Sequence, residues 1–150
     1  MSSAADALPG LPHVTEHLTI RQVPGEGIIV LERTAVPFPE SDVALDEVFA
    51  EFVAVLRELP RADLDMIIDS RRSRGRNDAA FERIQHKYRR DIFTAFRSAS
   101  VVLASVVGRM QVERYEREGG ATDYGHFSDV DEAIDALRRS RGEGGIESAG

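Results

Sequence analysis

The sequence predicts a single α/β domain in which a mixed β-sheet is flanked by about four helices. Two observations carry this prediction. An opening pair of apolar runs joined by turn residues is typical of a hairpin, and short apolar runs then alternate with segments of helical period. The chain has 150 residues, of which 42% are hydrophobic and 30% are charged, which suits one globular domain that buries its core without disulfides.

The first half of the chain contains a hairpin and a helix. Apolar and polar residues alternate over 18–22, turn residues follow, and 28–34 is a β-rich apolar run. Ser41 or Asp42 is placed to cap a helix whose apolar residues recur on one face, and Pro60 ends that helix.

The second half alternates between buried-type strands and helices, which predicts parallel βαβ units. Strands are expected at 64–68, 100–104 and 124–127. Helices are expected to begin at Asn77 or Asp78, near Val107, and at Ser128 or Asp129.

Both ends of the chain lack a buried-face pattern. Residues 1–16 are rich in Ala, Ser and Pro and are expected to form a flexible arm, and 142–150 a flexible tail. The folded domain is therefore expected to span 17–141.

Composition and charge exclude several classes of function. A net charge of −7 opposes attraction to nucleic acid or anionic lipid, because both carry negative charge. The chain has no cysteine, so thiol chemistry and thiolate metal sites are excluded. No signal-peptide pattern and no apolar run long enough for membrane insertion occurs, so we expect a cytoplasmic protein.

The element order and two phrases, IIDSRRSRGRNDAAFE and FSDVDEAIDAL, resemble the STAS (SpoIIAA-like) fold, in particular bacterial STAS/SEC14-like proteins. The resemblance implies a domain that docks on a protein partner, with a phosphorylatable serine at the start of the helix after the central strand. That place falls on Asp78 and Ala79 here. The acceptor hydroxyl is missing, so the phosphorylation switch is not expected to carry over.

The loop between the strand ending at Asp69 and the next helix is the main candidate site. Ligands of open α/β sheets bind at such strand-to-helix connections, and arginine forks suit phosphate or carboxylate. The alternative interpretation is that these arginines solvate the loop or pair with nearby acids. The partner- or anion-binding candidates are Arg71, Arg72, Arg74, Arg76, Asn77 and Asp78.

A second candidate segment follows the strand at 100–104. It contains Ser105, Gly108 and Arg109, where a phosphate could approach the glycine. The alternative interpretation is that Gly108 allows close packing between strand and helix.

No spacing predicts a catalytic group, a metal site or a cofactor. Asp69 and Asp78 have no nucleophile beside them, and helix capping explains Asp78 more simply. His13 and His17 have metal-ligand spacing only if they lie on a helix, which Pro12 disfavours.

We therefore expect a non-enzymatic regulatory or scaffold domain that binds a protein through the loop 70–78 and the following helix. The alternative is a carrier of a small hydrophobic or anionic ligand, with its pocket at the carboxyl edge of the sheet. Ile92, Phe93 and Phe96 form a wider apolar face than one sheet contact needs, so a homodimer is a further alternative.

Overall fold

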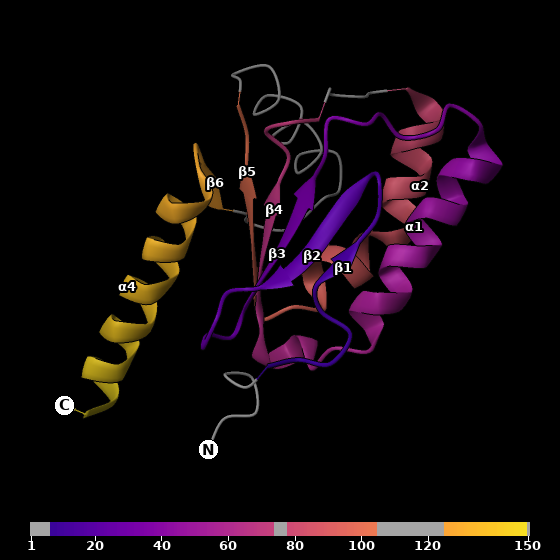
Figure 1. Cartoon of the computed structure of the whole chain (residues 1–150). Helices are drawn as coiled ribbons and strands as arrows, with labels where there is room; N and C mark the ends of the chain where they lie inside the picture. Colours follow the sequence, from indigo (N-terminus) through magenta and orange to yellow (C-terminus); the bar gives the residue numbers. More distant parts are fainter. Residues whose placement is uncertain (1–6, 74–77, 105–124, 150) are drawn as a thin grey trace.

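In the described part of the chain, six strands form one sheet in which neighbouring strands follow one another in chain order (Figure 1). The structure is a computed structural model and describes residues 7–73, 78–104 and 125–149. The strands are β1 (His13–Val14), β2 (Leu18–Gln22), β3 (Ile28–Arg33), β4 (Asp65–Asp69), β5 (Ser98–Val102) and β6 (Gly125–Phe127).

The sheet is mixed, as the sequence predicts. β1, β2 and β3 pair in antiparallel fashion, and the β2–β3 hairpin is confirmed. β3, β4, β5 and β6 pair in parallel. The carboxyl ends of these four strands therefore lie at one edge of the sheet.

Three α-helices lie in the described part of the chain, and each starts at a polar cap. Ser41 accepts a first-turn backbone N–H at 3.3 Å, Asp78 accepts one at 3.0 Å, and Asp129 accepts one at 2.8 Å. The helices are α1 (Asp42–Arg57), α2 (Ala79–Arg89) and α4 (Val130–Ala149), with a 3₁₀ turn η2 (Arg61–Asp63) and a π-helical turn η3 (Arg90–Thr94).

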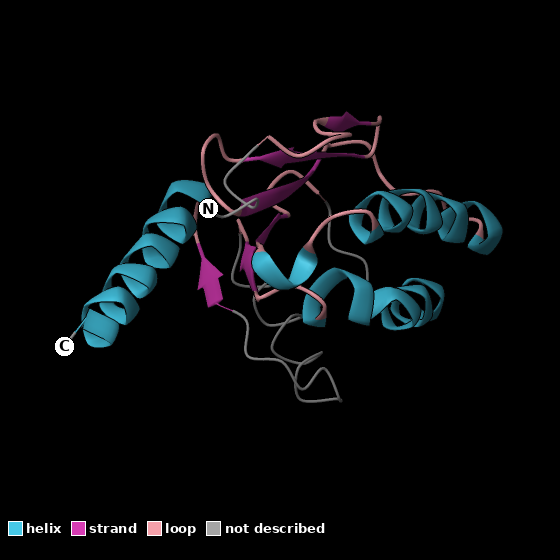
Figure 2. Cartoon of the chain, turned by 90° about the horizontal axis from the view of Figure 1, so that it is seen from below, coloured by secondary structure: helices cyan, strands magenta, loops and turns pink. Residues whose placement is uncertain are grey.

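The helices cover both faces of the sheet, with α1 and α2 on one face and α4 on the other (Figures 1 and 2). The connections β3–α1–β4 and β4–α2–β5 step across the sheet in the same direction. Because parallel crossovers share one hand, their two helices lie on the same face. None of the helices in the described ranges is long and apolar enough to cross a membrane.

Strand alternation builds two hydrophobic clusters. Ile29 and Leu31 pack on the side of α1 and α2, whereas Ile28 and Val30 pack on the side of α4. The larger cluster contains five aromatic rings in mutual contact. These are Phe38, Phe49, Phe52, Phe81 and Tyr88.

The two ends differ from the sequence prediction. In the N-terminal stretch expected to be an arm, residues 13–14 form β1, and Leu8 is buried with its N–H donated to Gln22 at 2.9 Å. At the other end, α4 continues to Ala149 and includes the stretch expected to be a tail. The helix predicted near Val107 lies outside the described residues.

The prediction of a surplus apolar face at the end of α2 is wrong. Ile92, Phe93 and Phe96 are all buried in the larger cluster. In η3 the N–H of Ala95 donates to the carbonyl of Arg90 at 2.9 Å, so this turn holds one residue more than an α-turn. The wider turn changes the direction of the side chains that follow, and the ground for a homodimer on this face is removed.

Candidate functional site

Carboxylates gather at the edge where the parallel strands end. Glu32 and Asp69 are register partners on β3 and β4, so their side chains leave the same face of the sheet as neighbours. Asp129 follows β6 and caps α4 on that face. Ligands of open α/β sheets bind outside this edge, which makes it the candidate site.

Asp69 holds Arg71 two residues further along the chain. The buried Asp69 carboxylate accepts the Arg71 backbone N–H at 3.1 Å, Nε at 2.9 Å and Nη2 at 2.9 Å. The bond to Asp69 is the main cause that raises the pKa of Arg71, and the charges of Asp129 and Glu32 add to it. Arg71 therefore serves first as the counter-ion of this acidic edge.

A hollow of about 280 Å³ lies between the face of β2 and β3, the loop after β4 and the start of α4. Its apolar lining comes from Val23, Val130 and Ile134. Its charged lining is formed by Arg21, Glu32, Arg71, Asp129 and Asp131. The hollow thus has an apolar part and charges of both signs, with carboxylates in excess.

The structure describes three of the six residues predicted in the loop. For Arg71 the alternative interpretation holds, because it pairs with Asp69. Arg72 is exposed and has no ion pair within the described ranges. Asp78 caps α2, as expected from its sequence context. The remaining candidates lie outside the described residues, namely Arg74, Arg76, Asn77, Ser105, Gly108 and Arg109.

The helix after the loop presents cations on its outer face. Arg83 and Lys87 on α2, and Arg90 directly after it, are exposed, whereas the apolar residues of α2 face the core. Arg83 donates to the exposed Asp42 at 2.8 Å, yet its side chain remains 62% exposed. The predicted strand-to-helix loop and this helix face therefore form one basic stretch of the chain.

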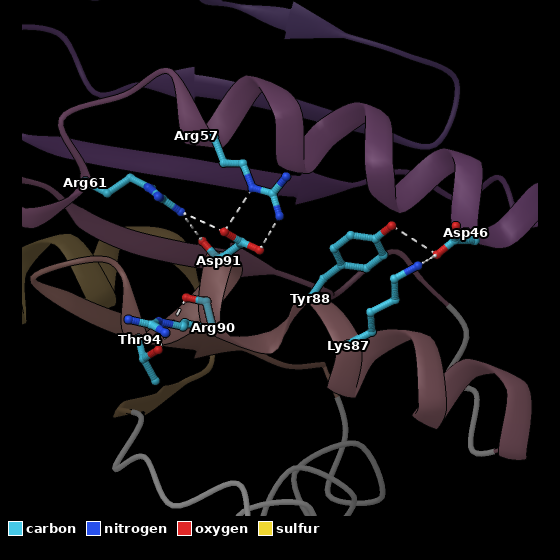
Figure 3. Close-up of polar contacts among 8 residues, drawn as sticks. All are labelled: Asp46, Arg57, Arg61, Lys87, Tyr88, Arg90, Asp91 and Thr94. Carbon is cyan, nitrogen blue, oxygen red and sulfur yellow. Dashed lines mark hydrogen bonds and ion pairs between the residues drawn. The ribbon is translucent and has the colours of Figure 1, made fainter.

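Polar contacts fix α2 beside α1 (Figure 3). Lys87 Nζ lies 2.9 Å and Tyr88 Oη 3.0 Å from Oδ1 of Asp46, and both donate to it. The bond from Lys87, followed by that from Tyr88, lowers the pKa of Asp46. The same bond to Asp46 raises the pKa of Lys87, so both groups stay charged across the physiological range.

Asp91 in η3 makes the second contact with the α1 side of the layer (Figure 3). Its two carboxylate oxygens accept Nε and Nη2 of Arg57 at 3.1 and 2.9 Å, and Arg61 Nη1 lies 3.2 Å from Oδ1. The bonds from Arg57, with a smaller contribution from Arg61, lower the pKa of Asp91. These contacts hold the basic helix face in a fixed orientation.

The two N-terminal histidines do not come together as ligands. His13 lies on β1 with its Nε2 3.7 Å from Glu51 Oε1, and His17 Nε2 lies 3.2 Å from Glu16 Oε1. Within the ranges that the structure describes, no group of three or more His, Asp or Glu side chains could hold a metal ion.

Sequence reasoning missed most of the hollow. The hairpin pattern accounts for Arg21 and Glu32 only as strand residues. Glu32 is a charged residue on a strand face that is otherwise apolar, with Ile28 and Val30, and that is the signal that could have found it. Arg21 gave no such signal, because Thr19 lies on the same face of β2. Asp131 carried no such signal, because acidic residues are common in the first turn of a helix.

Comparison with known proteins adds no relative to this description. No family model, no curated protein and no solved structure matches the chain.

Proposed function

We propose that this chain is a non-enzymatic regulatory or scaffold domain, and that it binds an acidic surface of a protein partner. The binding surface consists of the loop 70–78 and the outer face of α2. Below we call residues 70–90 the basic segment.

Charge asymmetry is the observation that carries the proposal. The basic segment has eight basic and two acidic residues, whereas the rest of the chain has 11 basic and 24 acidic residues. A partner selected by this segment must be negative, because the segment carries a net positive charge whereas the rest of the chain carries a net negative charge. An acidic protein surface of limited size meets that condition.

Exposure supports the same assignment. Arg72 and Arg90 are exposed, and neither side chain makes an ion pair in the described part of the chain. Lys87 is paired with Asp46, but 58% of its side chain is still exposed. Guanidinium groups are more weakly hydrated than ammonium groups, so contact with an acidic partner costs them less hydration free energy. Charge-assisted hydrogen bonds to the partner's carboxylates would then form.

The resemblance to STAS domains agrees with this proposal, because those domains dock on proteins. It rests on the two sequence phrases and on the element order. The described elements are compatible with the coarser α/β class of that fold.

Carriage of a small ligand is the second candidate function, and the hollow at the carboxyl edge favours it. The hollow's lining argues against the hydrophobic or anionic ligand expected from the sequence. Three of its five charged side chains are carboxylates, and Arg71 is already bound to Asp69.

Site-specific photo-crosslinking tests the proposed function. A photoreactive amino acid replaces Ala79, the exposed first residue of α2, and in a control chain it replaces the exposed Ser140 on α4. Neither change removes a charge. In native cells, position 79 is expected to capture a defined acidic protein, in a yield that falls with salt, and position 140 is not.

Three results would contradict the proposal: no captured protein at position 79, the same set of proteins at both positions, or nucleic acid as the captured species.

A further inference from the structure

Among the residues that the structure describes, four charged side chains of the hollow make no ion pair. Arg21 is half-buried on β2 and makes no hydrogen bond to any described residue through its side chain. Glu32 is half-buried on β3, and neither it nor Asp131 makes an ion pair in the described ranges. Asp129 uses Oδ1 to accept the N–H of Glu132, and its second oxygen has no such bond. The hollow thus holds one unpaired guanidinium beside three unpaired carboxylates.

Arg71 does not alter this balance. Its guanidinium forms two bonds with the buried carboxylate of Asp69, which does not line the hollow. The pair is neutral as a unit. The charge that a ligand meets is therefore set by Arg21 and the three carboxylates, and it is negative overall.

The apolar lining and the size restrict the ligand further. Val23 and Val130 are buried, and together with Ile134 they line the hollow with hydrocarbon. At about 280 Å³ the hollow lies at the small end of ligand sites, which commonly span about 300–1,000 Å³. An amino acid suits this size, whereas a nucleotide or a lipid does not.

We propose that this hollow binds a free basic amino acid of the lysine class. The ligand's carboxylate pairs with Arg21, and its two ammonium groups pair with Glu32 and with the carboxylates at the start of α4. Its alkyl chain covers the apolar lining. This class supplies a carboxylate for Arg21, one ammonium group for Glu32, a second for the two carboxylates of α4, and a hydrocarbon chain for the apolar lining.

The inference is independent of the protein-binding proposal. It uses the unpaired charges on β2, β3 and α4, whereas the proposed partner surface is the basic segment. Arg71 belongs to both, but it is already paired with Asp69. The variants chosen below lie outside the basic segment, so failure of one proposal leaves the other standing.

Titration of the full chain with L-lysine, followed by amide chemical shifts in NMR spectra, tests the inference. We expect saturable shifts at Arg21, Glu32 and Asp131. Two analogues each lack one end of the ligand: norleucine has no side-chain ammonium, and 1,5-diaminopentane has no carboxylate. Both are expected to bind at least about tenfold more weakly, because a charged hydrogen-bond partner stays unsatisfied in each case.

Variants of the protein test the same assignment. Glu32→Gln and Asp131→Asn keep the shape of the hollow and remove one charge each, so each is expected to weaken lysine binding by about tenfold. Glu132→Gln is the matched control on the same helical turn, because Glu132 does not line the hollow. Far-UV circular dichroism checks that every variant is folded.

Four results would overturn the inference. They are the absence of saturable shifts around the hollow, norleucine or 1,5-diaminopentane binding as tightly as lysine, unchanged affinity in both charge variants, and a loss in Glu132→Gln equal to that in Asp131→Asn.

Discussion

Asp65 is a buried carboxylate at which β4, β5 and α4 meet, and its replacement by alanine is expected to destabilise the domain by about 2–4 kcal/mol. Its side chain is 5% exposed. Arg97 donates to it through Nε at 3.2 Å and Nη2 at 2.8 Å, and Ser98 Oγ donates at 2.6 Å. Arg141 on α4 also pairs with this carboxylate.

The magnitude follows from what each partner loses. Breaking a fully buried ion pair costs about 3–5 kcal/mol, because a charge is left without compensation. Here the Arg97 side chain is 43% exposed and the Arg141 side chain 39%, so both can turn to water and recover part of that cost. The Ser98 hydroxyl is half-buried and loses a bond to a charged acceptor, which is worth about 1.5–3 kcal/mol.

Urea unfolding at neutral pH measures the effect as a lower midpoint with an unchanged slope. Asp63→Ala is the control, because Asp63 is exposed in the 3₁₀ turn before β4 and is expected to change stability by less than about 0.5 kcal/mol. An Asp65→Ala variant as stable as the Asp63→Ala variant would refute the account of this carboxylate.

Three further predictions concern the helix layer. Phe49→Ala is expected to lower the free energy of unfolding by about 3–5 kcal/mol, because Phe49 is buried among other rings. A loss below about 1 kcal/mol in thermal unfolding would be inconsistent with that packing. Asp78→Ala removes the cap on the Phe81 N–H and should cost about 1 kcal/mol, with Asp78→Asn close to the parent in the same assay. The bond from Arg57 is the main cause that lowers the pKa of Asp91 below its ordinary value of 3.8. The contribution of Asp91 to stability is therefore present above pH 3.8 and is lost as the pH falls through the lower pKa of the folded state. Urea midpoints measured across the acid range should fall less steeply with pH in Asp91→Asn than in the parent, and an equally steep fall would argue against the ion pair.

Much of the fold can be predicted from the sequence because local patterns determine it. The hairpin, the caps at Ser41 and Asp78, and the parallel strands all follow from periodicity and turn chemistry. Strand β1 has only two residues and no alternation that a pattern could detect. The burial of Phe93 depends on a π-helical turn, which helical periodicity at 3.6 residues cannot anticipate.

The candidate site is less accessible to sequence reasoning, because it depends on distances between segments that are far apart in the chain. Asp69 and Arg71 are only two residues apart in the sequence, but other acidic side chains could also pair with Arg71. The sequence does not show which of these pairs forms. The hollow brings Arg21 and Asp131 together only because α4 packs across the sheet face that carries β2 and β3. No local sequence pattern predicts where α4 packs on the sheet.

The central claim is that the basic segment binds an acidic partner, and the affinity of the photo-captured partner for single-residue variants tests it most directly. Arg72→Ala and Arg90→Ala each remove an exposed cation of the segment, and Arg139→Ala removes an exposed cation of α4 as a control. The account predicts that each segment variant weakens binding by about two- to tenfold and makes the remaining affinity less sensitive to salt, with Arg139→Ala equal to the parent. Segment variants that bind as tightly as the parent at low salt, or an Arg139→Ala variant that is weakened as much as they are, would contradict it.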